Sequence, residues 1–284
     1  MTIATLRDVL QPALRGHYAI AGLVVLGWED ARAYVDAAEA EGVPVILQAG
    51  PGCRAHTPLR VLGTMFRVLA EGANVPVVAH LDHGEGAEVC RQAMDCGFTS
   101  VMFDGSAMEV AQNVDLTAQI VSMARAAGVS VEAEVGFVGY AGGAASQGTD
   151  PAEAALMHAT GIDALAVAVG NTHLMTSSDG VIDWPRLRTI EAACPGLPLV
   201  LHGGSGLPSA LRSQLARETA VCKFNIGTEL RQAFGVSLRG VLAADAEVFD
   251  RNVILRGTMG AMTQAARGVI RAVSTSNLPA NNHE

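Results

Sequence analysis

The chain has 284 residues, of which 50% are hydrophobic and only 17% are charged, and its formal net charge at pH 7 is -9. That length can bury a substantial core, and the acidic balance argues against nucleic acid as a partner, because clustered Lys and Arg hold phosphate backbones. No run of eighteen apolar residues is present, so a membrane span is not expected, and residues 1–12 lack the apolar core of a signal peptide. The five cysteines form no CxxC pair, which is typical of reduced thiols, so we expect a cytoplasmic protein.

Short apolar runs alternate with segments of helical length along the chain. The runs are rich in Val, Ile and Leu, as expected of strands buried on both faces. They lie at residues 17–25, 44–48, 76–81, 100–103, 129–135, 164–169, 198–202 and 222–226. Eight strand-then-helix units predict an α/β fold, a single (β/α)8 TIM barrel over residues 1–284 with a loose tail from about residue 275. A doubly wound sheet is the rival, but no GxGxxG motif follows the first run.

Helix signals support this division of the chain. Residues 28–41 and 59–71 are Ala-rich or Arg-bearing segments of helical length between predicted strands. Asp150 is a good N-cap, Pro151 suits the first helical position, and Glu153 stands three residues after the cap. We therefore expect a helix to begin at Pro151.

Histidines stand where three of the predicted strands end. His83 follows the third strand, His173 the sixth, and His202 closes the seventh. These ends converge at one mouth of a barrel, where its chemistry takes place, and three imidazoles with an open fourth position suit Zn²⁺ or a similar divalent metal. A single histidine at a strand end is more often a hydrogen-bonded residue than a metal ligand. We expect His80 to be such a residue, with its side chain in the barrel interior.

Glycine-bearing loops follow the last two strands, at HGGSG (202–206) and NIGT (225–228). Glycines let backbone N–H groups approach a ligand, and the Ser and Thr hydroxyls complete a cradle for an anion. Phosphate sites in these barrels commonly use the loops after strands seven and eight. The plainer alternative is a tight connection from strand to helix.

Carboxylates occur near the same mouth. Asp104 follows the fourth strand, and Glu132 and Glu134 lie on the fifth with the same parity. Acids that face inward near three histidines can orient the metal ligands or offer a second metal position. They can equally be paired charges of the barrel interior.

In these stretches the sequence resembles the class II, metal-dependent ketose-bisphosphate aldolases, and most closely the tagatose-bisphosphate and fructose-bisphosphate branch. The matching stretches follow the order of that family over nearly the whole chain. They are HLDHG (80–84), GFTSVMFDGS (97–106), VEAEVG (131–136), GIDALAVAVGNTH (161–173), LVLHGGSG (199–206) and KFNIGTEL (223–230).

The resemblance implies a lyase that reversibly cleaves a ketose phosphate or bisphosphate to dihydroxyacetone phosphate and an aldehyde through an enediolate. It implies Asp82 as the proton-transfer residue and one Zn²⁺ per subunit. The implied zinc ligands are His83, His173 and His202, with Asp104 and Glu134 at a second metal position. The implied substrate-binding residues are Gly203, Ser205, Asn225, Gly227 and Thr228. A monovalent cation near the phosphate and a homodimer or homotetramer are further implications.

Two departures from the family pattern leave alternatives open. Leu174 stands where relatives usually carry Gly, and the loop of residues 137–149 lacks the acid that relatives use to protonate the enediolate. The alternatives are an aldolase with a different, even unphosphorylated, donor, or a degenerate metal-binding accessory subunit. Lys223, the only lysine of the chain, suggests a Schiff-base aldolase, although such an enzyme needs no strand-end histidines.

Overall fold

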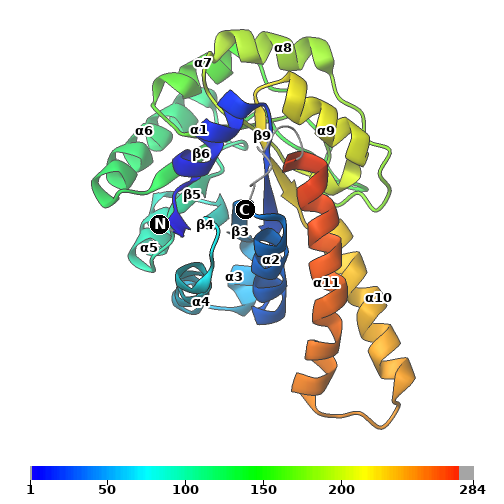
Figure 1. Cartoon of the computed structure of the whole chain (residues 1–284). Helices are drawn as coiled ribbons and strands as arrows, with labels where there is room; N and C mark the ends of the chain where they lie inside the picture. The colour runs from blue at the N-terminus through cyan, green and yellow to red at the C-terminus, as the bar shows by residue number, and fades with distance from the viewer. Residues whose placement is uncertain (1, 275–284) are drawn as a thin grey trace, which may run out of the picture.

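The structure, a computed structural model, describes residues 2–274 and has nine strands in one parallel sheet (Figure 1). The strands are β1 (Ile3–Ala4), β2 (Ile20–Val24), β3 (Val45–Ala49), β4 (Val77–Gly84), β5 (Ser100–Phe103), β6 (Ser130–Val135), β7 (Ala164–Val167), β8 (Leu199–Leu201) and β9 (Val221–Ile226). The helices are α1 (Leu6–Gly16), α2 (Trp28–Glu41), α3 (Pro51–His56), α4 (Leu59–Gly72), α5 (Ala87–Asp95), α6 (Val110–Ala127), α7 (Pro151–Ala159), α8 (Trp184–Ala193), the 3₁₀ helix η1 (Gly204–Gly206), α9 (Ser209–Glu218), α10 (Thr228–Ala244) and α11 (Arg251–Ser274).

Strands β2 to β9 close into a barrel. Each pairs in parallel with the next, and β9 returns to pair with β2. The two-residue β1 adds to the start of β4. The predicted (β/α)8 barrel is therefore confirmed, and every predicted apolar run overlaps one of these eight strands. The loose tail predicted from residue 275 lies outside the described residues.

The helix signals in the sequence agree with the helices that form. Helix α2 spans the predicted residues 28–41, and α7 begins at Pro151 with Asp150 as its N-cap, whose side chain accepts from the Ala152 N–H. Helices α1, α3, α10 and α11 lie outside the segments that the sequence signals identify as helical. None of the helices within residues 2–274 is long and apolar enough to cross a membrane.

Inside the barrel, an apolar layer lies at the N-terminal ends of the strands and is closed by α1. Leu6, Val9 and Leu10 of α1 are buried against side chains from the strands, which include Ile46 and Val78. Along the same inward rows, Gln48 follows Ile46 on β3, and His80 follows Val78 on β4. The interior thus changes from apolar to polar toward the carboxyl ends of the strands.

Helices α10 and α11 form a hairpin that projects away from the barrel (Figure 1). Leu230 is the only buried residue of α10, whereas α11 also packs along α2. The first turn of α10 begins at Thr228, directly after β9, so the same helix starts at the mouth of the barrel and ends in the projecting hairpin.

We expect Leu10→Ala to lower the free energy of unfolding by about 2–5 kcal/mol, because it leaves a cavity in the layer that α1 closes. Urea denaturation followed by circular dichroism measures the change. Leu156→Ala is the matched control, since Leu156 is 55% exposed on α7 and its truncation should change stability by less than about 0.5 kcal/mol. Equal effects of the two substitutions would show that the layer closed by α1 does not contribute specially to the free energy of unfolding.

Candidate metal and catalytic site

A cavity of about 390 Å³ opens at the carboxyl ends of the barrel strands. Its walls come from the end of β4, from the loops after β2, β3, β6, β7, β8 and β9, and from the first turn of α10. Among the residues that line it are Asp82, His83, Tyr140, His173, Leu174, Gly203, Ser205, Asn225, Gly227, Thr228 and Arg231. Most of the residues singled out in the sequence therefore meet in one place.

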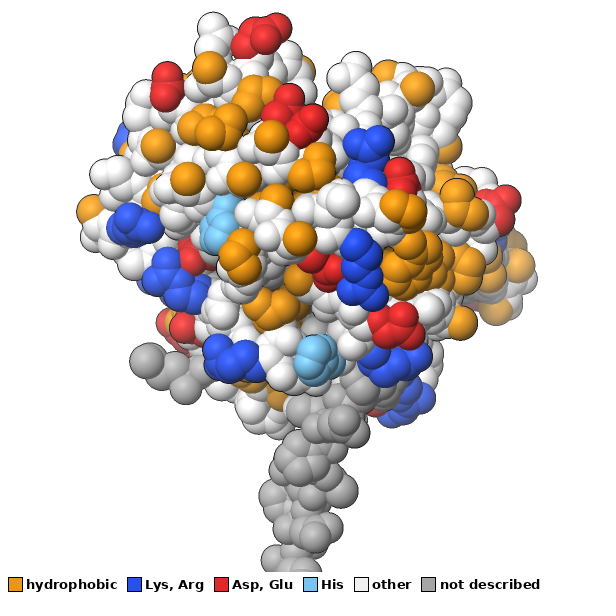
Figure 2. Space-filling view, turned by 90° about the horizontal axis from the view of Figure 1, so that it is seen from above, with side chains coloured by type: hydrophobic (Ala, Val, Ile, Leu, Met, Phe, Trp, Pro, Cys, Tyr) orange, Lys and Arg blue, Asp and Glu red, His pale blue; other side chains and the backbone are white. Residues whose placement is uncertain are grey.

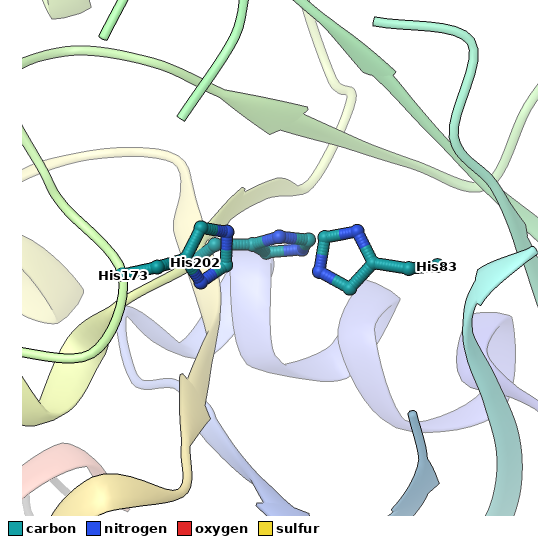
Figure 3. Close-up of side chains that lie close together, drawn as sticks. All are labelled: His83, His173 and His202. Atoms are coloured by element: carbon teal, nitrogen blue, oxygen red, sulfur yellow. The ribbon is translucent and has the colours of Figure 1, made fainter. Parts of the chain in front are cut away.

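Three imidazoles point toward one another beside this cavity (Figure 3). One ring nitrogen from each of His83, His173 and His202 lies within 4.8 Å of the others, a spacing that could hold a metal ion. His83 ends β4 and His202 directly follows β8, as the sequence predicts. His173 lies in the loop that follows β7, as the sequence predicts.

The orientation of His202 follows from a buried carboxylate. Its Nε2 lies 3.2 Å from an oxygen of Glu132, whose other oxygen accepts from Lys223 Nζ at 2.7 Å. An ionised carboxylate only accepts, so Nε2 carries the proton and the lone pair of Nδ1 is left free. That Nδ1 is buried without a hydrogen-bond partner. An unpartnered buried nitrogen of this kind fits a metal ligand.

A second group of potential ligands combines His83 with Asp104 and Glu134. His83 Nδ1 lies 2.6 Å from Asp104. Burial alone would lower the pKa of His83, but the carboxylates of Asp82, Asp104 and Glu134 raise it to about 9. Burial and the adjacent Asp104 carboxylate raise the pKa of Glu134 to about 8. One buried oxygen of Glu134 has no hydrogen bond, and it lies 3.5 Å from His202 Nδ1. A bound cation would reduce the repulsion between the Asp104 and Glu134 carboxylates. It would also contact the Glu134 oxygen that has no hydrogen bond.

The carboxylate of Asp82 lies next to the histidines, where β4 ends. It is 5% exposed and accepts a hydrogen bond of 3.0 Å from Asn225 Nδ2. Burial alone would raise the pKa of Asp82, but the positive charges of His83 and Lys223 keep it below its ordinary value. Asp82 is therefore an ionised carboxylate that can accept a proton from a ligand in the cavity.

The two glycine-bearing loops, at residues 202–206 and 225–228, form another part of the cavity wall. The Ser205 hydroxyl accepts from the backbone N–H groups of Gly227 and Glu229, each at 3.3 Å, which joins η1 to the start of α10. Gly203 has φ 65°, and a Cβ atom there would lie 2.1 Å from the carbonyl oxygen of Thr172. Only glycine therefore allows the loops after β7 and β8 to approach this closely.

Lys223 lies below the cavity rather than in it. Its side chain is fully buried, is paired with Glu132, and lies 3.3 Å from His80 Nε2. His80 Nδ1 in turn lies 2.8 Å from Ser100 Oγ, so His80 is a hydrogen-bonded interior residue, as expected. A lysine that is held in this way and does not line the cavity is a poor candidate for a Schiff base.

Arg54 is a part of the site that the sequence argument missed. Its guanidinium, 9% exposed, donates to the carbonyl oxygens of Ala49, Asp82 and His83 at 2.9, 2.6 and 2.9 Å. His83 has φ 51°, a left-handed conformation that costs a non-glycine residue free energy. Arg54 thus ties the end of β3 to the strained end of β4. No local sequence signal announces this contact.

Tyr140 is a second part that was missed. Its ring stacks on His173 with centroids 4.9 Å apart and 22° between the planes. The backbone fixes this pair, because His173 N donates to Gly139 O at 2.8 Å and Ala141 N donates to His173 O at 2.9 Å. Partial burial and the nearby carboxylates of Asp104, Glu134 and Asp82 raise the pKa of Tyr140. The side chain therefore reaches the cavity as a neutral phenol.

Comparison with known proteins gives a consistent result. The family model described as class-II fructose-bisphosphate aldolase matches residues 4–278. The fructose-bisphosphate aldolase of Geobacillus stearothermophilus is 37% identical over 97% of this chain and 98% of its own length. A protein of the same name from Staphylococcus epidermidis is 35% identical, over 98% of this chain and 99% of its own length. The crystal structure of the YdjI aldolase from Escherichia coli K12 superposes with a TM-score of 0.82 at 32% identity and covers 95% of this chain and 97% of that chain.

We expect Arg54→Met to weaken the affinity for Zn²⁺ about 10–100-fold, because three carbonyls lose their donor and the segment that carries His83 relaxes. Competition with a chromophoric chelator measures the affinity of the metal-free protein. Arg54→Lys should recover part of the loss, since one ammonium can reach only some of the three oxygens. Arg60→Met, on the exposed side of α4, is the control and should bind Zn²⁺ as the unaltered chain does.

Proposed function

Because the chain belongs to the class II fructose-bisphosphate aldolase family, we propose that it reversibly cleaves a ketose phosphate or bisphosphate to dihydroxyacetone phosphate and an aldehyde. The observation that carries this proposal is the cluster of three imidazoles beside the ionised Asp82 in one cavity. A metal site next to a carboxylate base is what a C–C cleavage through an enediolate requires.

The proposed metal is one Zn²⁺ per subunit, held by His83, His173 and His202. The Nδ1 of His202, which is buried without a hydrogen bond, and the donor set of three imidazoles support this choice. When bound, the ion supplies positive charge for the oxygen atoms of the developing enediolate. We assign Asp104 and Glu134, together with His83, to a second metal position, supported by the buried oxygen of Glu134 that has no hydrogen bond.

Asp82 is the proposed base. In the cleavage direction it removes the proton of the C4 hydroxyl while the C3–C4 bond breaks, and the electron pair of that bond stays on C3. The hydrogen bond from Asn225 Nδ2 holds one carboxylate oxygen, so the other is free to face the substrate. In synthesis the same carboxyl group returns the proton to the new hydroxyl.

The donor phosphate is proposed to lie against Gly203, Ser205, Asn225, Gly227 and Thr228. Helix α10 begins at this wall, and the positive end of its dipole favours an anion there. Arg231, one turn into α10, also lines the cavity and adds a positive charge to this wall. A monovalent cation beside the phosphate belongs to the same proposal.

We further propose that the chain assembles into a homodimer or homotetramer through the hairpin of α10 and α11. Hydrophobic side chains on this hairpin are exposed to solvent: Val236 by 64%, Leu242 by 42%, Phe249 by 93% and Val253 by 55%. On the face shown in Figure 2, acidic and basic side chains of the described residues are interspersed with hydrophobic ones, without a broad basic patch. Hydrophobic association with a second copy therefore suits the surface better than binding to a polyanion.

Asp82→Asn should reduce kcat about 10²–10⁴-fold while Zn²⁺ remains bound, because only the base is lost. His202→Ala should lose both metal and turnover. The direct assay follows deuterium uptake from D₂O into dihydroxyacetone phosphate by NMR, with and without a chelator. Exchange that persists in the chelated protein would contradict the metal-dependent proposal, and no exchange by the Zn²⁺-loaded chain would favour another donor or a degenerate subunit.

Combining Val236→Glu with Phe249→Glu should dissociate the assembly, because two charges cannot be buried in an apolar interface without partners. Light scattering coupled to gel filtration should then give the 29.3 kDa of a single chain. Leu156→Glu places one charge on the exposed face of α7 and should leave the mass of the assembly unchanged. An unaltered chain that elutes at 29.3 kDa at all concentrations would rule the assembly out.

A further inference from the structure

The loop between β6 and α7 is held in place although it contains no charged side chain before Asp150. Residues 137–149 include no Asp or Glu. Phe137 and Gln147 pair through their backbones at 2.8 Å in both directions, and Gly139 N donates to Ser146 Oγ at 2.9 Å. Ser146 Oγ donates in turn to the carbonyl oxygen of Asn171 at 3.1 Å. The loop is therefore tied to the segment that carries His173.

These ties place Tyr140 in the wall of the cavity. Its ring lies flat on His173, and it lines the same cavity as Asp82 and Asn225. Among the hydrogen bonds of residues 2–274, none involves the Tyr140 hydroxyl, and the residue is 42% exposed. A phenol at this place has a proton to donate and no partner within the protein.

The proposed reaction needs a second proton carrier. After cleavage, Asp82 holds the proton of the C4 hydroxyl, and the carbon that has lost its aldehyde still requires a proton. The hydroxyl of Ser205, which also lines the cavity, already accepts from two backbone N–H groups in the phosphate wall. Thr228 Oγ1 accepts from Arg231 at 3.3 Å in the same wall. Neither hydroxyl stands beside the histidines as Tyr140 does.

We propose that Tyr140 is a catalytic residue whose hydroxyl delivers the proton to the donor carbon of the enediolate. This inference rests on the proposed aldolase function and deepens it. In cleavage, the electron pair of the enediolate forms a new C–H bond with the phenolic proton, and dihydroxyacetone phosphate and a tyrosinate result. The tyrosinate then takes a proton from water and Asp82 releases one to water, so that both groups return to their starting states. In synthesis these steps run in reverse: the phenol first gives its proton to water, and the tyrosinate then removes the same proton from dihydroxyacetone phosphate.

Tyr140→Phe tests this role because it removes the hydroxyl and keeps the ring that stacks on His173. We expect deuterium uptake into dihydroxyacetone phosphate to fall about 10²–10³-fold at unchanged Zn²⁺ content. Tyr18→Phe is the matched control, since Tyr18 packs against the apolar layer at the other end of the barrel, and it should exchange at the rate of the unaltered chain.

A second measurement separates proton delivery from a structural role. Hexacyanoferrate(III) oxidises an enediolate, with two electrons passing to two equivalents of oxidant, and thus removes the intermediate without protonation. With fructose 1,6-bisphosphate as the probe, the oxidant should raise aldehyde release by Tyr140→Phe toward the rate of the unaltered chain. The unaltered chain itself should respond little.

The outcomes are distinguishable from a failure of the proposed function. If the unaltered chain exchanges deuterium and Tyr140→Phe exchanges equally fast, Tyr140 is not the proton carrier and the aldolase proposal stands. Slow cleavage by Tyr140→Phe that the oxidant does not accelerate, or a loss of Zn²⁺, would show that the hydroxyl supports the structure of the site and does not deliver the proton, and would overturn the inference. If the Zn²⁺-loaded unaltered chain neither exchanges nor cleaves, the aldolase proposal itself fails.

Discussion

A buried pairing of charges in the barrel interior is the constraint on which the site depends. Lys223 and Glu132 are both fully buried, and charges are tolerated there only when they are paired and hydrogen-bonded. Removal of one partner would leave the other uncompensated at a cost of about 3–5 kcal/mol. The same carboxylate directs Nε2 of His202. One ion pair therefore supports the charge balance of the interior and also leaves Nδ1 of His202 without a hydrogen bond.

The side chains that point into the barrel fall into an apolar group, which stabilises the fold, and a polar group, which forms the site. Toward α1 the strands carry apolar side chains such as Ile46 and Val78, and toward the mouth they carry His80, Asp82 and Glu132. The first group resembles an ordinary core, where shape decides the outcome. The second is polar because each of its members serves another side chain or a ligand, and it can tolerate that polarity only above a layer that already excludes water.

Much of this arrangement was predictable because it depends on local patterns. Long apolar runs identify parallel strands, and the order of the fold then brings His83, His202 and Asp82 to one mouth. Arg54 was missed because its acceptors at Asp82 and His83 are distant in sequence, and an isolated arginine in a six-residue helix gives no periodic signal. Tyr140 was missed for a related reason: its position follows from backbone pairing between two irregular loops, which no propensity encodes.

Helix α10 belongs to the cavity at one end and to the projecting hairpin at the other. It runs from Thr228 to Ala244, so a stiff rod about 25 Å long joins the anion wall to the surface that a second copy is proposed to cover. If association orders this rod, linkage requires that an anion seated at Thr228 strengthens association by the same factor by which association strengthens anion binding. Dilution, which dissociates the assembly, would then weaken the binding of the phosphorylated substrate.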